Sequence, residues 1–409
     1  MSKFVWIDYD DEQRRRMNAL ARLFSETDAR DELGLGVIRD SISDLLFPGT
    51  STIQTRVRYM LFIPWLFIEL EGKELTGSDF EKAADNAERK LIKILTEQNP
   101  SEWGVFGRVT EDLIRLPSSV YWQGLAHWGI RAFEGSHADY CYSMVDCHKR
   151  RQIVRGEEEE NFDSKRINWH KGVYSLKPEN FPDKATLDLT YEEALYIKER
   201  IQTTQNLSLL ARFLEYPRQI NESIELWEYP VVDHCSQEQK GWVEHARLFS
   251  KIMHGAALLY NYYVADTLAR DKSDKGKKWS VQYSDKFLAW VKSINDEAKT
   301  IKSWDMGAFW GMVDIKAMSN YPGARAFIET WIKKVKTAAD LKKLIDDAAI
   351  RTLIYEREGA LKLPNSRRLS SPEARRRWNG EVGSGTRPYN FRWPIAKNFL
   401  NEIFKGLSR

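Results

Sequence analysis

The sequence contains few cysteines and no long hydrophobic run. Cys141, Cys147 and Cys235 form a sparse, odd-numbered set, which favours a reducing compartment over a disulfide framework. The longest apolar runs, at 59–68 and 252–265, are too short to span a membrane, and the first residues contain no apolar core of signal-peptide length. We therefore expect a cytoplasmic protein that does not insert into membranes.

Recognisable catalytic motifs are also missing. The chain has no nucleophile elbow and no Walker pair, and none of its seven histidines has a lysine two residues later, as phospholipase-D-like nucleases require. His137, Cys141, Cys147 and His148 offer zinc-type ligands but lack the usual C-x₂₋₄-C spacing, which favours buried thiols and a hydrogen-bonded histidine. We predict no cofactor and no metal.

Apolar residues recur at helical intervals through most of the 409 residues. Ser78 with Glu81 predicts a capping box at the start of an amphipathic helix, and Asp340 marks another helix start. Residues 242–270 are apolar around most of a helical circumference, which predicts a central helix packed on several sides. The predicted fold class is mainly α: two packed, multi-helical domains with few short strands and a basic C-terminal extension.

Breaks in this periodicity suggest the domain boundaries. Four consecutive glutamates and two prolines interrupt the helical pattern between 152 and 188. The prediction has four parts: an N-terminal helical domain (1–151), an acidic linker (152–188), a second helical domain (189–361) and a basic, aromatic extension (362–409).

A glycine pair, Gly34 and Gly36, precedes a predicted helix and resembles a phosphate-binding turn. The spacing of a complete dinucleotide or Walker loop is absent. We therefore favour a tight turn over a phosphate site.

The chain also offers a candidate nuclease site. Glu71 and Lys73 follow an apolar run, and an acidic-x-Lys step at the end of a strand is typical of restriction-like nucleases. With Asp44 upstream, these residues could form a two-carboxylate Mg²⁺ site. Because Pro64 interrupts the apolar run, the run fits a helix as well as a strand, and a metal-dependent nuclease remains an alternative.

The C-terminal region concentrates positive charge. Residues 362–409 contain eleven Lys or Arg against three Glu, or +8, whereas the whole chain is +3, so residues 1–361 sum to −5. Guanidinium groups that neutralise phosphate alternate here with aromatic rings on which bases can stack. The predicted nucleic-acid contacts are Arg367, Arg368, Arg375, Arg376, Arg377, Trp378, Arg387, Tyr389, Arg392, Trp393 and Lys397. The alternative is a solvated basic surface whose aromatic residues pack on the preceding domain.

Three stretches carry a family resemblance: FVWIDYDDEQRRR (4–16), RDELGLGVIRDSISDLLFPGTSTIQTRVRYMLFIPWLF (30–67) and RLPSSVYWQGLAHWGIR (115–131). The third also predicts a helix capped by Ser118 or Ser119. Together the stretches resemble a bacterial family of about 400 residues that is described as a domain of unknown function. The resemblance implies a component of anti-phage defence loci, encoded beside superfamily 2 helicases and phospholipase-D-like nucleases. It supplies no catalytic residues.

Charge and resemblance together predict a non-enzymatic subunit of a bacterial anti-phage defence system. It would bind DNA through its basic extension and would bind a helicase or nuclease partner. The alternatives are the metal-dependent nuclease and a scaffold that binds only protein.

Overall fold

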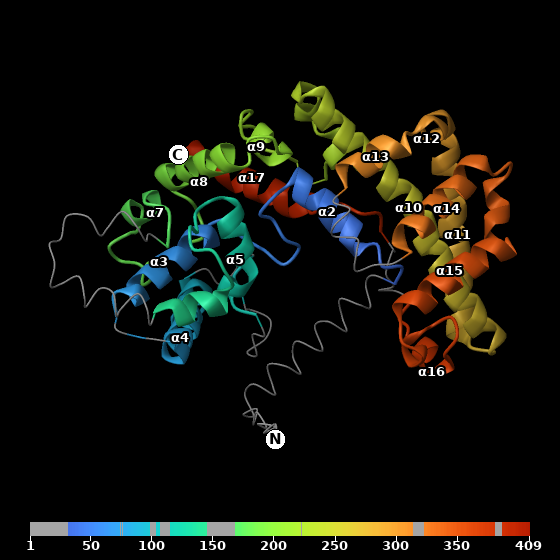
Figure 1. Cartoon of the computed structure of the whole chain (residues 1–409), viewed down its shortest axis with the longest axis horizontal. Helices are drawn as coiled ribbons and strands as arrows, with labels where there is room; N and C mark the ends of the chain where they lie inside the picture. The colour runs from blue at the N-terminus through green and yellow to red at the C-terminus, as the bar shows by residue number, and fades with distance from the viewer. Residues whose placement is uncertain are drawn as a thin grey trace, which may run out of the picture. The chain divides into compact units, whose positions relative to one another are not determined.

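The computed structural model describes residues 32–73, 75, 77–98, 104–106, 115–144, 168–221, 223–313, 323–380 and 387–409. These residues form helices throughout, and their one β pairing is an isolated bridge between Arg131 and Trp169 (Figure 1). The predicted mainly α, multi-helical fold is confirmed. Within the described ranges, no helix has the length and apolar character needed to cross a membrane.

The chain forms two compact units, and each is discontinuous in sequence. Unit 1 comprises Met1–Ile42 and Lys240–Phe391, and unit 2 comprises Ser43–Gln239 and Arg392–Arg409. The predicted domains were continuous segments of the chain, whereas each compact unit combines two separate segments. Two of the three boundaries fall within helices, α2 (Gly36–Leu46) and α10 (Gln237–Arg270), where no break in periodicity marks them, and the third lies just before α17 (Trp393–Leu407).

Unit 2 consists of short and medium helices. Apart from its part of α2, the helices in its described residues are α3 (Tyr59–Glu71), α4 (Gly77–Gln98), α5 (Pro117–His127), α7 (Gly172–Ser175), α8 (Tyr191–Thr204), α9 (Leu209–Phe213), η2 (Leu226–Glu228), η3 (Pro230–His234) and α17 (Trp393–Leu407).

The core of unit 2 is aromatic. Helix α3 is buried along most of its length, and Phe67 makes ring contacts with residues from four other parts of the unit: Phe80, Trp122, Tyr140 and Trp169. Helix α17 buries one face, including Phe399 and Ile403, and packs beside α8 (Figure 1). Because apolar residues recur along α17 at helical spacing, the last helix of the chain is an integral part of this core.

Unit 1 is built around the long helix α10. Besides its part of α2, the other helices in its described residues are α11 (Asp274–Asp296), α12 (Ala298–Ser303), α13 (Met306–Met312), α14 (Ala324–Thr337), η5 (Leu341–Ile345), α15 (Ala348–Leu361), η6 (Pro364–Ser366) and α16 (Pro372–Arg376).

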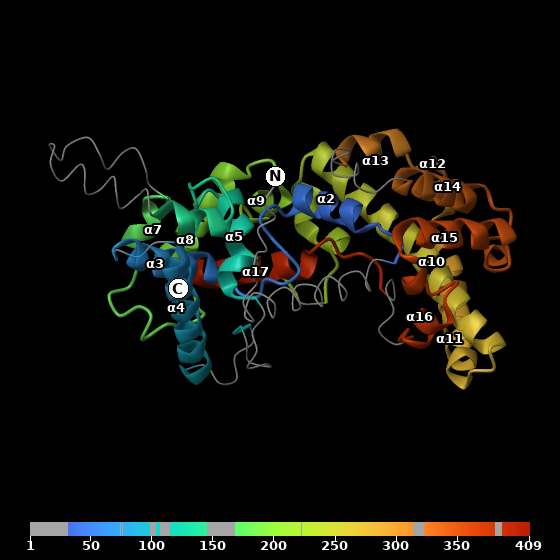
Figure 2. The same ribbon diagram turned by 60° about the horizontal axis from the view of Figure 1, so that its bottom comes forward.

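Helix α10 confirms the predicted central helix. It lies beside α11 (Figure 2), and a Cβ added to Gly255 would lie 2.3 Å from the Trp290 ring, so glycine permits this close packing. From α14, the Trp331 indole donates to the carbonyl of Ile252 at 2.9 Å. Ring contact and backbone hydrogen bond together fix α11 and α14 on α10.

The predicted helix starts are partly correct. Asp340 caps η5 as expected, and Asp347 then caps the start of a separate helix, α15. Helix α4 is present, but it begins at Gly77, which places Ser78 inside its first turn, so the cap assignment is wrong.

Helix α5 begins at Pro117 as predicted, but neither Ser118 nor Ser119 caps it. The N-cap residue is Leu116, which has no side-chain acceptor, and the Ser118 N–H donates to Glu88 Oε2 at 2.7 Å. A buried carboxylate from another helix therefore replaces the local cap.

Candidate functional site

The predicted C-terminal extension is divided between the two units. Its residues up to Phe391 belong to unit 1, and α17 belongs to unit 2. The region is therefore packed into both cores, and each predicted nucleic-acid contact has to be considered in its own unit.

Two of the predicted arginines satisfy backbone carbonyls in unit 1. Arg367 donates to the carbonyls of Gly359 at 2.7 Å and Lys362 at 2.8 Å, at the end of α15. Arg375 is buried and donates to the carbonyls of Arg368 and Leu369, both at 2.9 Å. The end of α15 leaves carbonyls without helical partners, and Arg367 supplies donors there, while Arg375 supplies donors to the turn after η6.

Arg368 belongs to a buried ionic cluster in unit 1. It pairs with Glu32, and Lys362 contacts both Glu32 and Glu358. The two carboxylates are 2% and 1% exposed, and the Tyr260 hydroxyl lies 2.7 Å from Glu358 Oε1. Burial, followed by the Glu358 charge, raises the pKa of Tyr260 well above its usual value. The charge of Arg368 neutralises buried acids and is not available to a ligand.

The aromatic residues of the region are also packed inside. Trp378 is fully buried in unit 1 and donates to Asn261 Oδ1 at 3.1 Å. The Tyr389 ring stacks on Phe249 with centroids 6.0 Å apart. Trp393 is 1% exposed in unit 2 and donates to a backbone carbonyl at 2.8 Å. The prediction that Trp378 and Trp393 offer open stacking faces is wrong, because their large apolar surfaces are used for packing.

Among the eleven predicted contacts, Arg376, Arg377 and Arg387 are exposed. Arg377 pairs with Glu373. In unit 2, Arg392 pairs with Asp44 at 2.5 Å, and Lys397 is half-buried. The expected continuous basic and aromatic surface is therefore not present on the described part of this region.

The structural basis of the nuclease alternative is also wrong. Glu71 is the last residue of helix α3, so no strand precedes it. Its Oε1 accepts hydrogen bonds from the Tyr140 hydroxyl and, at 3.0 Å, from Asn168 and Trp169. Asp44 is paired with an arginine, and Lys73 lies in the turn after α3. Glu71 is therefore satisfied by protein donors.

The candidate zinc ligands are only partly described. His137 Nε2 lies 4.0 Å from Cys141 Sγ, and burial raises the pKa of this thiol to about 12. Cys147 and His148 lie outside the described residues. Across the described ranges, no three or more His, Cys, Asp or Glu side chains are grouped so that they could hold a metal ion.

The Gly34 turn is closed by an arginine. Gly34 has φ +61°, and the buried Arg357 donates to the carbonyls of Leu33 at 2.8 Å and Gly34 at 3.2 Å. The turn therefore presents carbonyl oxygens to a buried cation, as a tight turn can.

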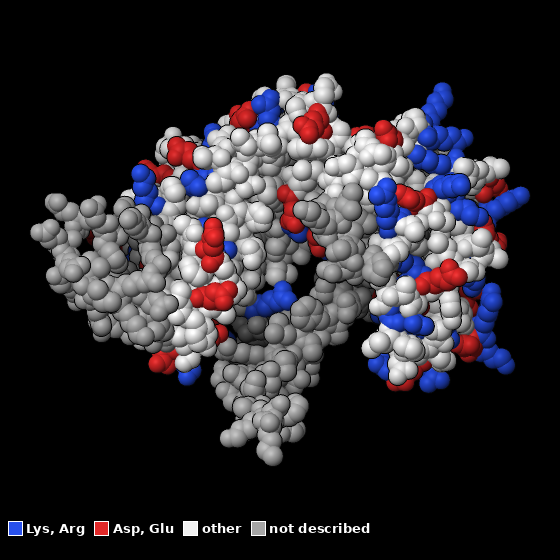
Figure 3. Space-filling model, viewed as in Figure 1, with Lys and Arg blue, Asp and Glu red and all other residues white. Residues whose placement is uncertain are grey.

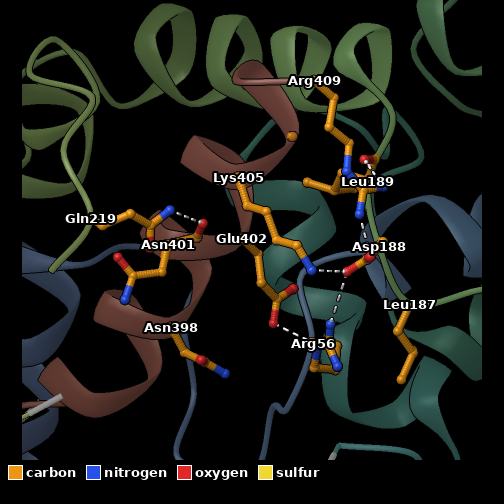
Figure 4. A pocket seen from close by; sticks show the side chains of 11 residues that line it. Arg56, Leu187, Asp188, Leu189, Gln219, Asn398, Asn401, Glu402, Lys405 and Arg409 are labelled. Carbon is orange, nitrogen blue, oxygen red and sulfur yellow. Dashed lines mark hydrogen bonds and ion pairs between the residues drawn. The ribbon is translucent and has the colours of Figure 1, made fainter. Parts of the chain in front are cut away.

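A charged pocket in unit 2 was not predicted. It has a volume of about 240 Å³ and lies between α17 and the segment before α8 (Figure 4). Arg56 Nε contacts Glu402 Oε1 at 2.6 Å, while Asp188 contacts Lys405 at 2.8 Å and also pairs with Arg409 (Figure 4). The one signal in the sequence was the spacing of Glu402 and Lys405, three residues apart, which places them on one face of a helix.

The charged side chains of this pocket neutralise one another. Burial raises the pKa of Glu402 to about 7, although the Arg56 charge and a hydrogen bond from the Val57 N–H oppose the rise. Burial also acts to raise the pKa of Asp188, but hydrogen bonds and charge from Lys405 and Arg409 outweigh it, and the pKa is lowered. Ligand pockets usually enclose about 300 to 1,000 Å³, so this small, ion-paired pocket fits a role in anchoring α17.

The comparisons with known proteins give one match. Residues 1–406 match DUF6361, described as a family of unknown function. The chain belongs to the DUF6361 family. No curated protein and no solved structure matches it. The match confirms the resemblance to a domain of unknown function of about 400 residues.

Charge in this DUF6361 chain is divided between the two units. Unit 1 contains 35 Lys or Arg against 26 Asp or Glu, and unit 2 contains 27 against 33. The formal net charges are therefore +9 and −6. The expected negative charge of residues 1–361 comes mainly from unit 2: residues 43–239 carry 23 Lys or Arg against 32 Asp or Glu, whereas residues 240–361 carry 21 against 15.

Proposed function

We propose that this DUF6361 protein binds nucleic acid through unit 1 and acts without a catalytic site of its own. The observation that supports this function is the net charge of +9 on unit 1 against −6 on unit 2. A cationic surface gains affinity for nucleic acid by releasing the counterions condensed on its phosphates. An anionic unit gains nothing in this way, so contact is confined to unit 1.

The cellular role that we propose follows the family resemblance. The protein is a subunit of a bacterial anti-phage defence system, works in the cytoplasm on DNA, and associates with a helicase or a phospholipase-D-like nuclease encoded nearby. Three sequence blocks, within residues 4–131, support this role through their resemblance to defence-associated proteins. The anionic unit 2 is available for the protein partner.

Fluorescence anisotropy with labelled duplex and single-stranded DNA tests nucleic-acid binding. We expect the affinity to fall by at least tenfold between about 50 and about 200 mM salt, because each phosphate contact releases counterions. Absence of binding at low salt, or an affinity that does not change with salt, would overturn the proposal. Point variants are needed because truncation after Leu361 would also remove Trp378 and α17 from the two cores.

Incubation with plasmid DNA and Mg²⁺ or Mn²⁺ tests the non-catalytic role. We expect the plasmid to remain intact, because Glu71 is occupied by three protein donors. Cleavage by the wild type that disappears in Lys73→Ala would instead support the nuclease alternative.

A further inference from the structure

Six exposed lysines lie on four neighbouring elements of unit 1. Helix α11 packs against α12 and η5, and α12 packs against α14. Figure 3 shows Lys and Arg side chains projecting along the end of unit 1 that carries α12 and α14. We call this set the lysine surface: Lys292, Lys299, Lys302, Lys333, Lys342 and Lys343.

The packing of these helices positions the lysine surface. Trp290 of α11 stacks on Trp331 of α14 with centroids 5.9 Å apart, and Lys336 Nζ of α14 donates to the Trp304 carbonyl, just after α12, at 2.5 Å. Lys292 and Lys333 each come two residues after a stacked tryptophan. Two residues turn a helix by about 200°, so both lysines point away from the helix contact.

The lysine surface differs from the C-terminal arginines in its partners. Within the described ranges, none of its six ammonium groups makes an ion pair or a hydrogen bond. Several nearby acids already have backbone donors or ion pairs: Asp305, Asp340 and Asp347 cap helices, and Glu329 pairs with Arg325. The lysine charges are therefore available to an external anion.

On α12, α14 and η5, which carry five of the six lysines, the exposed side chains suit phosphate better than bases. Helices α12 and α14 expose Thr300 and Thr330, and hydroxyl groups are common phosphate donors. The sequences of α12, α14 and η5 contain no Asn or Gln, and their one arginine, Arg325, is paired. The large apolar residues of these three elements are not exposed, which disfavours base stacking and a dry protein interface.

We infer that the lysine surface binds the phosphate backbone of nucleic acid without selecting a base sequence. This inference rests on the proposed nucleic-acid-binding function and assigns it to particular residues. A lysine ammonium contacts phosphate as a point charge, so it contributes affinity but does not distinguish one base sequence from another.

The central test is a triple variant, Lys299→Gln, Lys302→Gln and Lys333→Gln, in the full chain. We expect at least a tenfold loss of duplex affinity at about 100 mM salt, and a log–log salt slope shallower by about three, one for each lost contact. Exposed Lys→Gln changes remove charge without opening the core, and an unchanged melting temperature would verify this.

Two matched triples provide the controls. One changes three exposed lysines of α4 in unit 2 (Lys82, Lys90 and Lys93), and the other changes the exposed C-terminal arginines (Arg376, Arg377 and Arg387), all to Gln. We expect both controls to bind within about twofold of wild type. If the C-terminal arginine triple loses affinity while the lysine-surface triple does not, the inference is overturned and the proposed function stands. If the α4 triple loses affinity while the lysine-surface triple does not, both the inference and the assignment of binding to unit 1 are overturned. If the wild type itself does not bind, the proposed function fails and the inference with it.

A set of duplexes with unrelated sequences tests the second half of the inference. We expect affinities within about threefold of one another, because phosphate contacts carry no base information. A preference greater than tenfold for one sequence would overturn binding that is independent of sequence.

Discussion

Each unit contains part of the basic C-terminal region. The arginines of this region form a buried ion pair in unit 1 and a more exposed one in unit 2. In unit 1, Arg368 meets Glu32, whose side chain is 2% exposed. In unit 2, Arg392 meets Asp44, whose side chain is 54% exposed. The same kind of ion pair is therefore buried in one unit and lies near the surface in the other.

This difference shows that a count of tail charges does not measure what a ligand can reach. A buried carboxylate without a cation is costly, so the charges in the core of unit 1 are fixed by the fold. Surface pairs contribute little to stability and are screened by salt. Among the described residues, the six lysines of the lysine surface, on α11, α12, α14 and η5, are a group of unpaired cations that lies outside the C-terminal region.

The largest effect should come from the apolar anchor of α17 in unit 2. Trp393 makes ring contacts with Phe47, Phe213 and Tyr229, so Trp393→Ala should lower the free energy of unfolding by about 3 to 5 kcal/mol. Urea denaturation, with hydrogen exchange to assign the change to unit 2, measures it. The exposed Arg387→Ala serves as control, with an expected change within about 0.5 kcal/mol. A loss below about 1 kcal/mol in Trp393→Ala would contradict an integral α17.

Buried and exposed carboxylates provide the next comparison. Glu358→Ala should destabilise unit 1 by about 3 kcal/mol, because Lys362 and the Leu369 N–H lose a buried partner. Asp44→Ala should cost at most about 1 kcal/mol in unit 2. Urea denaturation with hydrogen exchange measures the loss of stability in each variant. Equal losses in Glu358→Ala and Asp44→Ala would contradict the conclusion that one carboxylate is buried and the other is near the surface.

A pH series should reveal the buried acids of unit 2. Burial raises the pKa of Glu88 from 4.5 to about 7, so the folded state holds this proton more tightly than the unfolded state does. The contribution to stability is full below about pH 4.5 and is lost as pH rises through about 7, a change of about 3 kcal/mol. Glu88→Gln should reduce the decline in the urea midpoint between about pH 5 and about pH 8. The decline that remains should come from Glu402. An unchanged pH slope would contradict the assignment.

Local sequence patterns predicted the helices well. Periodic apolar residues identified α10 and α4, and Asp340 was correctly identified as a cap, because these signals depend on neighbours in the same turn. The cap of α5 could not be predicted. Its acceptor, Glu88, comes from another helix, and only the tertiary fold brings the two together.

The C-terminal region could not be interpreted from composition for the same reason. The acids that meet Arg368 and Arg392 are Glu32 and Asp44, each more than 300 residues away in sequence. Counting charges within residues 362–409 cannot include these partners. The unit 2 pocket was missed similarly, because Arg56 and Asp188 are brought to α17 only by folding.

Hydrogen exchange on the full chain, with and without saturating duplex DNA, tests the central claim most directly. The account predicts slower exchange in α12, α14 and η5 of unit 1, and unchanged exchange in α17. Protection centred on residues 392–409 or elsewhere in unit 2, with none on the lysine surface, would contradict it.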